Sequence, residues 1–480
     1  MRTIRGNRFG KAIVLVGAIG TGGCGAGPVE EAPAAPGGRG EGGRGEGGKA
    51  DAIDYANDPA RFDRNLERRF DRLPQKGEAR NIPWAGDYWS SARDSINIRW
   101  DGAEPSPAEK YAKAFGKADV PEEVSRYVGK KSSTEEIPGW VGICEGWSAA
   151  AIRELPPLKP VEKNGVTFYP GDLHGLITLL YARGNSDSKF LSRRCNDASA
   201  RFDAAGRAID SGCRDTNPGT LHIIATNYLG IKREAFVEDR TFDAEVWNQP
   251  VRGYEITAQR EISKNEANAL TGGDTSGGTT TTLLAETAIV KGGKEAGEVT
   301  VPASGILYLN SAGEGDVDLF VNVGGPASET RYTCKSTGGD AKESCTVREA
   351  AGTTVSWMLL GYAEASKASL TMTAPQSNAP YAFNPDAKRF VEVEMDLKYI
   401  SEAPPSRKSN VEEIDSYTRT DHYHYVLELA ADGTIIGGEY VGDTRRLHPD
   451  FLWLPQGAPL GEVAGISYDD VKALLDESRR

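Results

Sequence analysis

The sequence has little positive charge, few histidines and few cysteines. Its 480 residues carry 56 Lys and Arg against 69 Asp and Glu, a net charge of −13. Nucleic acid is excluded as a partner, because phosphate binding needs a basic face and the basic residues here are dispersed. What is present is a 39% hydrophobic content, which is enough for cores in roughly two to three domains of about 150 residues each.

The N-terminus lacks an apolar run long enough to span a membrane. Basic residues (Arg2, Arg5, Arg8 and Lys11) precede the short apolar run Ala12 to Ile19. Residues 1–24 therefore read as a signal peptide of an exported protein. Cys24 stands where a bacterial outer-membrane lipoprotein carries its lipidated cysteine. Thr21 replaces the leucine expected three residues earlier, so simple secretion remains the alternative.

Residues 25–60 are predicted to be a disordered tether. Gly25 to Lys49 contains the near-repeat GGRGEGGRGEGG and no aromatic residue. Such a segment buries too little apolar surface to offset its chain entropy. A flexible tether of this kind suits a protein held off a membrane surface by a lipid.

The six cysteines are expected to pair in an exported protein. Cys195 with Cys213, and Cys334 with Cys345, would each close a short polar loop, a closure worth about 3 kcal/mol. If Cys24 is lipidated, Cys144 remains as a free thiol. The alternative, a bond from Cys24 to Cys144, is disfavoured because Cys24 adjoins the tether.

Cys144 lies in the stretch Gly139 to Leu155, GWVGICEGWSAAAIREL, which predicts a glycine-rich loop leading into a helix. A helix N-terminus carries unsatisfied N–H groups and a partial positive charge, which favours a thiolate, the nucleophilic form of cysteine. The alternative interpretation is a buried cysteine that acts only as a small hydrophobe.

A thiol nucleophile needs a base, and the chain offers five histidines: His174, His222, His422, His424 and His448. His422 and His424 alternate with apolar residues in a predicted strand, so both lie on one face. The strand is predicted to form a hairpin that brings Asp443 back beside its start, as a Cys-His-Asp site requires. His174 and His222 enter apolar helical stretches, where a structural role is expected.

Several motifs together resemble the transglutaminase elicitor family, best known from oomycete cell-wall transglutaminases and present in bacteria. They are WAGDYW at 84–89, WDG at 100–102, SPAEKY at 106–111, the Cys144 stretch, YPGD at 169–172, VWNQPVRG at 246–253, GGE at 437–439 and HPDFLW at 448–453. The run at 246–253 is similar to the peptide by which plants sense these enzymes. The resemblance covers roughly Phe70 to Lys264 and Phe390 to Pro455.

The resemblance implies an α+β fold with a papain-like cysteine protease-type catalytic domain, akin to a bacterial IgG-degrading protease. It implies Cys144 as nucleophile, His424 as base and Asp443 as the orienting carboxylate. His422 is an alternative base, because the register of the paired histidines is ambiguous by two positions.

The sequence leaves the oxyanion site unassigned. Papain-like proteases place a glutamine about six residues before the cysteine, and Pro138 stands there in this chain. The Cys144 backbone N–H is one expected donor, and the indole of Trp89 or Trp140 is a candidate for the second. Trp247, in the VWNQPVRG run, is a further candidate for shaping the site.

A small all-β sandwich is expected to interrupt the catalytic domain. We expect its first part at 61–267, a Gly- and Thr-rich linker at 268–282, a sandwich at 283–375 and the second part at 376–480. The sandwich resembles a bacterial pre-peptidase C-terminal (PPC) domain, which implies binding to a cell-surface polymer. Asp316 and Asp318 are calcium candidates, but alternation favours a solvent-facing role for both.

The predicted activity is that of a protein-glutamine γ-glutamyltransferase, which joins Gln and Lys side chains of protein substrates through a Cys thioester. An exported cysteine peptidase or amidase is the first alternative, and its site would be open to water. A catalytically inert surface-binding lipoprotein is the second. The family implies calcium dependence, although no ligand loop appears in the sequence. Contact with a membrane is expected only through the N-terminal lipid.

Overall fold

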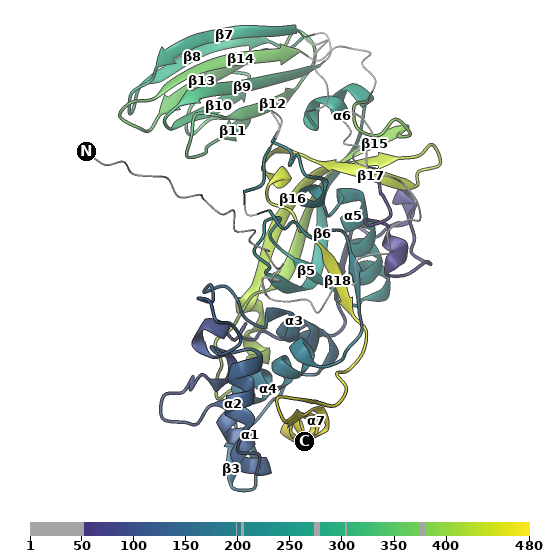
Figure 1. Cartoon of the computed structure of the whole chain (residues 1–480). Helices are drawn as coiled ribbons and strands as arrows, with labels where there is room; N and C mark the ends of the chain where they lie inside the picture. Colours follow the sequence, from purple (N-terminus) through teal and green to yellow (C-terminus); the bar gives the residue numbers. More distant parts are fainter. Residues whose placement is uncertain (1–51, 198, 203–205, 273–278, 303–304, 375–380) are drawn as a thin grey trace, which may run out of the picture.

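The computed structural model describes residues 52–197, 199–202, 206–272, 279–302, 305–374 and 381–480. The predicted signal peptide with Cys24, most of the tether and part of the linker lie outside these residues. Figure 1 shows helices at one end, a pair of sheets at the other, and long strands running between them. None of the helices in the described ranges is long and apolar enough to cross a membrane.

The central element is an antiparallel sheet in the order β17-β16-β15-β6-β5-β18-β4, with β1 added beside β6. Its strands are β1 (Lys76–Glu78), β4 (Ser188–Leu191), β5 (Val237–Asp239), β6 (Asn248–Ile262), β15 (Arg389–Ile400), β16 (Thr418–Leu429), β17 (Ile435–Tyr440) and β18 (Leu452–Pro455). Three of them, β6, β15 and β16, are long and run from the helical end towards the opposite end of the molecule (Figure 1). The predicted hairpin is confirmed, with Tyr425 of β16 paired to Tyr440 of β17.

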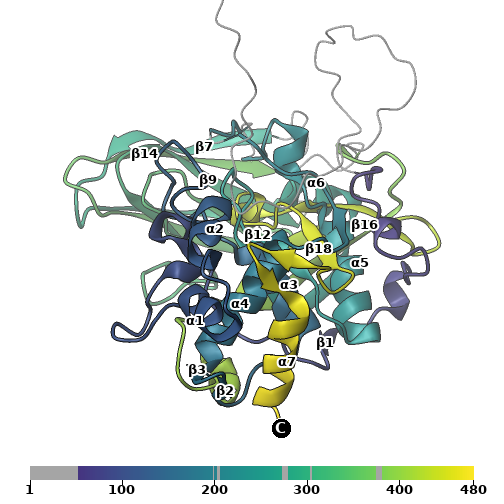
Figure 2. The ribbon, with the colours of Figure 1, turned by 60° about the horizontal axis from the view of Figure 1, so that its bottom comes forward.

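Helices cover both faces of this sheet. The α-helices are α1 (Pro107–Phe115), α2 (Val120–Tyr127), α3 (Cys144–Arg153), α4 (Pro170–Arg183), α5 (Pro218–Ala225), α6 (Lys264–Leu270) and α7 (Tyr468–Ser478). One core contains α1 to α4, α7 and the ends of β5 and β18. A second core lies between α5 and the strands β6, β15, β16 and β17. Figure 2 views the molecule from the helical end, where α7 comes forward.

Short elements complete the helical end and the edges. The short strands are β2 (Val161–Lys163), β3 (Val166–Phe168), β19 (Glu462–Val463) and β20 (Ile466–Ser467). The 3-10 segments are η1 (Pro59–Arg61), η2 (Phe70–Arg72), η3 (Ser91–Arg93), η4 (Ser95–Asn97), η5 (Ser211–Arg214), η7 (Val411–Tyr417) and η8 (Gly442–Arg445), and η6 (Thr226–Lys232) is a π-helix.

Residues 279–374 form two four-stranded antiparallel sheets, ordered β11-β10-β13-β8 and β12-β9-β14-β7. The strands are β7 (Thr279–Ala288), β8 (Lys294–Thr300), β9 (Ile306–Glu314), β10 (Val317–Val323), β11 (Cys334–Ser336), β12 (Ser344–Arg348), β13 (Thr354–Gly361) and β14 (Lys367–Ala374). We call this unit the sandwich. Its core includes alternate positions of single strands, such as Leu307 and Leu309 of β9, and Val317, Leu319 and Val321 of β10. The disulfide between Cys334 and Cys345 is confirmed.

Residues 52–60, which we expected in the disordered tether, instead pack on the folded chain. The Ile53 N–H donates to Ile436 O, which extends the edge of the sheet at β17. The Asn57 side chain is 4% exposed and donates to Asp215 Oδ1 at 2.8 Å. These contacts hold residues 52–60 against the folded chain, so the folded part begins earlier than predicted.

Candidate active site

Cys144 is the first residue of α3 and is completely buried. The helix N-cap is Ile143, whose N–H donates to Tyr88 O at 2.7 Å. This bond fixes the glycine-rich loop against the WAGDYW motif. The thiol therefore stands at the positive end of the helix dipole, as the sequence predicts.

The Cys144 thiol contacts the start of β6 and the residues just before it. Sγ donates to Val246 O at 3.8 Å, and the Asn248 Nδ2 donates to Sγ at 3.7 Å. Both partners belong to the VWNQPVRG run, so this motif packs directly on the thiol. A carboxamide thus lies beside the candidate nucleophile.

The Asn248 carboxamide is held from two sides. Trp453 Nε1, from β18, donates to Asn248 Oδ1 at 2.7 Å. Ser148 Oγ, one turn along α3 from Cys144, donates to the Asn248 backbone oxygen at 2.8 Å. Asn248 is 1% exposed and Trp453 5%, so water has little access to these bonds.

Two buried carboxyl groups belong to residues next to Asn248 and Cys144, namely Asp239 across the ladder and Glu145 along α3. Asp239 stands opposite Asn248 in the pairing of β5 with β6, and its Oδ1 accepts from Trp247 N at 2.8 Å. Burial raises the pKa of Asp239 well above its usual range. Burial also raises the pKa of Glu145, although its ion pair with Arg183 opposes this. The interior around Asp239 and Glu145 therefore disfavours unpaired negative charge on these two carboxyl groups.

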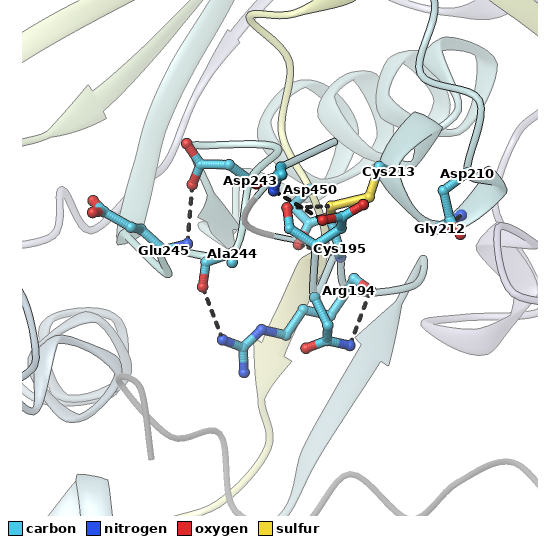
Figure 3. Close-up of a disulfide and its surroundings, with 12 residues drawn as sticks. Arg194, Cys195, Asp210, Gly212, Cys213, Asp243, Ala244, Glu245 and Asp450 are labelled. Atoms are coloured by element: carbon cyan, nitrogen blue, oxygen red, sulfur yellow. Dashed lines mark hydrogen bonds between the residues drawn. A yellow bond between two sulfur atoms is a disulfide. The ribbon is translucent and has the colours of Figure 1, made fainter. Parts of the chain in front are cut away.

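The disulfide between Cys195 and Cys213 is confirmed and lies beside the loop that joins β5 to β6 (Figure 3). Arg194 Nη2 donates to Ala244 O in this loop at 3.2 Å, and Cys195 N donates to Asp450 Oδ1 at 2.9 Å. Burial and the nearby Asp239 raise the pKa of Asp450 to about 10. The disulfide segment therefore anchors the loop that carries Val246 to the thiol.

The structure does not bring His424 or His422 to Cys144. His424 stands opposite Glu394 in β15, and Glu394 stands opposite Ala258 in β6. Ala258 lies about ten residues beyond Asn248, which corresponds to roughly 30 Å of strand. The predicted Cys-His-Asp arrangement is thus not assembled, because the long strands carry the histidines away from the helical end.

Both histidines of this pair have other partners. His424 Nε2 lies 3.0 Å from Glu392 Oε1, and His422 Nδ1 lies 2.5 Å from Asp396 Oδ1. Asp443 is exposed and lies in η8, near the His424 backbone as the hairpin predicts, because His424 N donates to Thr444 Oγ1. The partner of the His424 imidazole described here is Glu392, however, and not Asp443.

The other three histidines are buried among different groups. His174 stacks on Trp84, His222 Nδ1 lies 2.8 Å from the Tyr425 hydroxyl, and His448 stacks on Tyr440. Burial lowers the pKa of His174 and of His222 to about 3, and that of His448 to about 4. All three are therefore neutral at ordinary pH, and the contacts described here do not include Cys144.

The three tryptophans chosen as site-shaping residues lie in different places. The Trp89 ring faces Gly175 of α4, and Trp140 is half-buried in the loop before Cys144. The Trp247 ring is 6.2 Å from that of Tyr88, and its Nε1 donates to Glu245. Among these three, only Trp247 sits between the two residues that contact Sγ.

Sequence analysis missed Asn248 and Trp453. Asn248 lies in the VWNQPVRG run directly after Trp247, the candidate that the sequence offers there. Its role depends on which face of β6 meets α3, and no local pattern specifies that. A buried amide beside an aromatic donor is a tertiary feature.

Calcium has no evident ligand set in the described part of the chain. No group of three or more His, Cys, Asp or Glu side chains among the described residues is arranged to hold a metal ion. Asp316 precedes β10 and is half-buried, and Asp318 is the second residue of that strand. Asp318 is buried, so the solvent-facing role predicted for it is wrong. Calcium dependence therefore stays a prediction of the family resemblance, with no ligand residues assigned to it.

Comparison with known proteins matches most of the chain. The sequence profile named transglutaminase elicitor matches residues 54–136, 123–271 and 339–480. The crystal structure of the GP42 transglutaminase from Phytophthora sojae aligns with a TM-score of 0.56 and 28% identity, covering 87% of this chain and 95% of that chain. The periplasmic lysozyme inhibitor PliG from Aeromonas hydrophila matches 20% of this chain and 88% of its own, with 10% identity and a TM-score of 0.17. A search of curated protein sequences finds no significant match.

Proposed function

Because this chain belongs to the transglutaminase elicitor family, we propose that it is a protein-glutamine γ-glutamyltransferase with Cys144 as its nucleophile. One observation carries the proposal. Among the described residues, Cys144 is the cysteine that lies outside the disulfides formed by the other four, and it stands at the first residue of a helix. The GP42 enzyme that the chain resembles is a transglutaminase.

The proposed reaction has two acyl-transfer steps. In the first, Sγ of Cys144 bonds to the side-chain carbonyl carbon of a glutamine, the C–N bond breaks, and ammonia leaves with the thiol proton. In the second, a lysine amine attacks the thioester, an isopeptide bond forms, and the proton from the amine returns to sulfur. Amine incorporation therefore consumes one glutamine and one lysine and releases one ammonia.

The burial of Cys144 supports transfer over hydrolysis. A peptidase or amidase would need a site open to water, and the Cys144 side chain is fully enclosed. Exclusion of water protects a thioester from hydrolysis until an amine arrives. Some of the residues that cover Sγ must move aside for substrate to enter, so an opening step belongs to the proposed cycle.

Our proposal does not use His424 as the base. Its contact with Glu392 and its position along β16 place it far from the thiol. In the first step of the proposed reaction, the leaving ammonia carries away the thiol proton of Cys144. The family resemblance implies a papain-like fold. We propose that this likeness covers the helix that carries Cys144, but we do not extend it to a histidine base.

The compartment of the protein and the role of the sandwich are also proposals. We propose that the protein is exported from a bacterium, with Cys24 lipidated in the outer membrane or the chain secreted. Two disulfides support export, since disulfides are typical of oxidising compartments. We further propose that the sandwich is a PPC-type domain inserted in the catalytic domain, with a cell-surface polymer as its partner.

The experiment is incorporation of a fluorescent primary amine into a glutamine-rich protein by the purified full chain and its Cys144→Ala variant. Calcium and a chelator form separate arms. Incorporation by the wild type that disappears in the variant is the expected result. Cys144-dependent ammonia or peptide release without incorporation would assign a hydrolase, and inactivity in every assay would favour a surface-binding protein. The paired Cys334→Ala and Cys345→Ala variant serves as control, because it removes a disulfide in the sandwich and leaves Cys144 in place.

A further inference from the structure

The orientation of the Asn248 carboxamide is fixed by its partners. The indole N–H of Trp453 is a donor only, and it lies 2.7 Å from Asn248 Oδ1. The oxygen of the amide is therefore turned to Trp453 and the NH₂ group to Cys144, 3.7 Å from Sγ. The indole selects which end of the carboxamide faces the thiol.

The amide is held by rigid elements. Asn248 begins β6, Trp453 lies in β18, and Ser148 of α3 binds the Asn248 backbone oxygen. All three side chains are nearly or completely buried. The position of Nδ2 relative to Sγ is thus set by two strands and by the same helix that carries the thiol.

The contact that this NH₂ group makes in the resting protein is weak. A thiol sulfur is a poor hydrogen-bond acceptor, and buried N–H groups normally face oxygen. A strong acceptor appears only when a carbonyl oxygen near Sγ becomes negative. A donor whose bond strengthens in this way stabilises the transition state more than the ground state, which is the condition for catalysis.

We propose that Asn248 Nδ2 donates a hydrogen bond to the oxyanion formed during acyl transfer at Cys144, and that Trp453 is the positioning residue for that donor. This inference rests on the proposed function. When the S–C bond forms, the π electron pair of the carbonyl moves to its oxygen, which lies two bonds from Sγ and within reach of a donor at this distance. When the C–N bond breaks, the pair returns and ammonia leaves with the thiol proton. The same oxyanion forms again when the amine attacks.

Three variants of the full chain test the inference: Asn248→Ala, Asn248→Asp and Trp453→Phe. Loss of one oxyanion donor lowers kcat by about 10²- to 10³-fold, so we expect this loss for Asn248→Ala with KM nearly unchanged. Trp453→Phe removes the orienting hydrogen bond and part of the buried ring but leaves the Asn248 donor in place, and we expect a smaller loss of about tenfold. The assay follows ammonia release and amine incorporation in parallel.

Asn248→Asp supplies a readout that a structural role would not move. An ionised carboxylate cannot donate and repels an oxyanion, whereas a protonated carboxyl donates an O–H. We expect the activity of this variant, relative to the wild type at each pH, to rise as the pH falls. The matched control is Asn384→Ala, which removes another buried amide donor, to Glu428, at the far end of the sheet. It should lose stability but keep its kcat.

The outcomes separate the two proposals. If the wild type transfers amines through Cys144 but Asn248→Ala keeps its kcat within threefold, or loses activity only through KM, the inference is wrong and the proposed function stands. A flat relative pH profile for Asn248→Asp also contradicts the inference. If the wild type shows no Cys144-dependent ammonia release, both proposals are wrong.

Discussion

His424 Nε2 and Arg348 Nη2 share one acceptor, Glu392 Oε1, at 3.0 and 2.8 Å. The other oxygen of this carboxylate accepts from Arg260 Nη2 at 2.9 Å. Arg348 belongs to β12 of the sandwich, whereas His424, Arg260 and Glu392 belong to the central sheet. The histidine that the sequence suggested as a base thus helps to join the sandwich to the sheet.

The first prediction concerns the Glu392→Gln variant and pH. Burial opposes ionisation of Glu392, but its hydrogen bond to His424 and the charges of Arg348 and His424 lower its pKa from 4.5 to about 2. A lowered pKa stabilises the folded state above the unfolded value and loses this effect as the pH falls towards 2. We expect the variant to be less stable than the wild type by about 3 kcal/mol at pH 7.

Urea unfolding at a series of pH values measures this difference. It should shrink between about pH 4.5 and pH 2. Glu394→Gln is the matched control, because Glu394 is exposed on the same strand and faces His424 across the ladder. A loss of stability that is equal in the two variants, or independent of pH, would contradict the assigned role of Glu392.

The second prediction concerns His424→Ala. Because the long strands place this histidine roughly 30 Å from Asn248, we expect kcat for amine incorporation to stay within about threefold of the wild type. The free energy of unfolding should fall, since Glu392 loses a partner. His422→Ala, which removes an exposed side chain beside Asp396, is the control. A kcat as low as that of Cys144→Ala would restore His424 as the base.

The third prediction concerns the two disulfides. Replacing Cys195 and Cys213 by alanine frees the segment in which Arg194 binds Ala244, next to the residues that contact Cys144. We expect a loss of about 3 kcal/mol in stability and a lower kcat, because Val246 and Asn248 lose their anchored loop.

The control for this prediction is the double alanine variant at Cys334 and Cys345, whose disulfide lies in the sandwich. It should lower the melting temperature but leave kcat unchanged. Calorimetry and amine incorporation on the same samples distinguish the two variants. An equal loss of kcat in both would show that the Cys195 segment has no special link to the site.

The sequence predicted local features well. The strand and hairpin of His424, both disulfides and the helix at Cys144 follow from alternation, cysteine spacing and glycine placement. Each of these signals lies within a short stretch of chain. The prediction failed where it needed the path of long strands, since the distance from Cys144 to His424 depends on the length and register of β6, β15 and β16.

Some residues that carry the family resemblance have structural roles. Lys110 Nζ lies 2.6 Å from Asp172 Oδ2, and Trp100 Nε1 donates to Asp172 Oδ1 at 3.0 Å. Three separate motifs therefore meet in one buried polar cluster at the start of α4. Motif matching alone does not distinguish such a cluster from a catalytic one, because both retain charged and aromatic residues. The partners of each side chain decide the matter.

The last prediction compares two glycines of the Cys144 stretch. A Cβ on Gly146 would lie 2.1 Å from Thr178 O, since α3 and α4 approach closely there. A Cβ on Gly139 would meet nothing within 4 Å. We therefore expect Gly146→Ala to lose about 2 kcal/mol or more through overpacking, and Gly139→Ala to change stability by less than about 0.5 kcal/mol.

Urea unfolding and kcat of both variants test this comparison. Displacement of α3 from α4 would also shift Cys144 relative to Asn248, because the thiol lies only two residues before Gly146. Gly146→Ala should thus lose kcat as well as stability, while Gly139→Ala keeps both. Equal behaviour of the two variants would mean that the contact of α3 with α4 at Gly146 does not position the thiol.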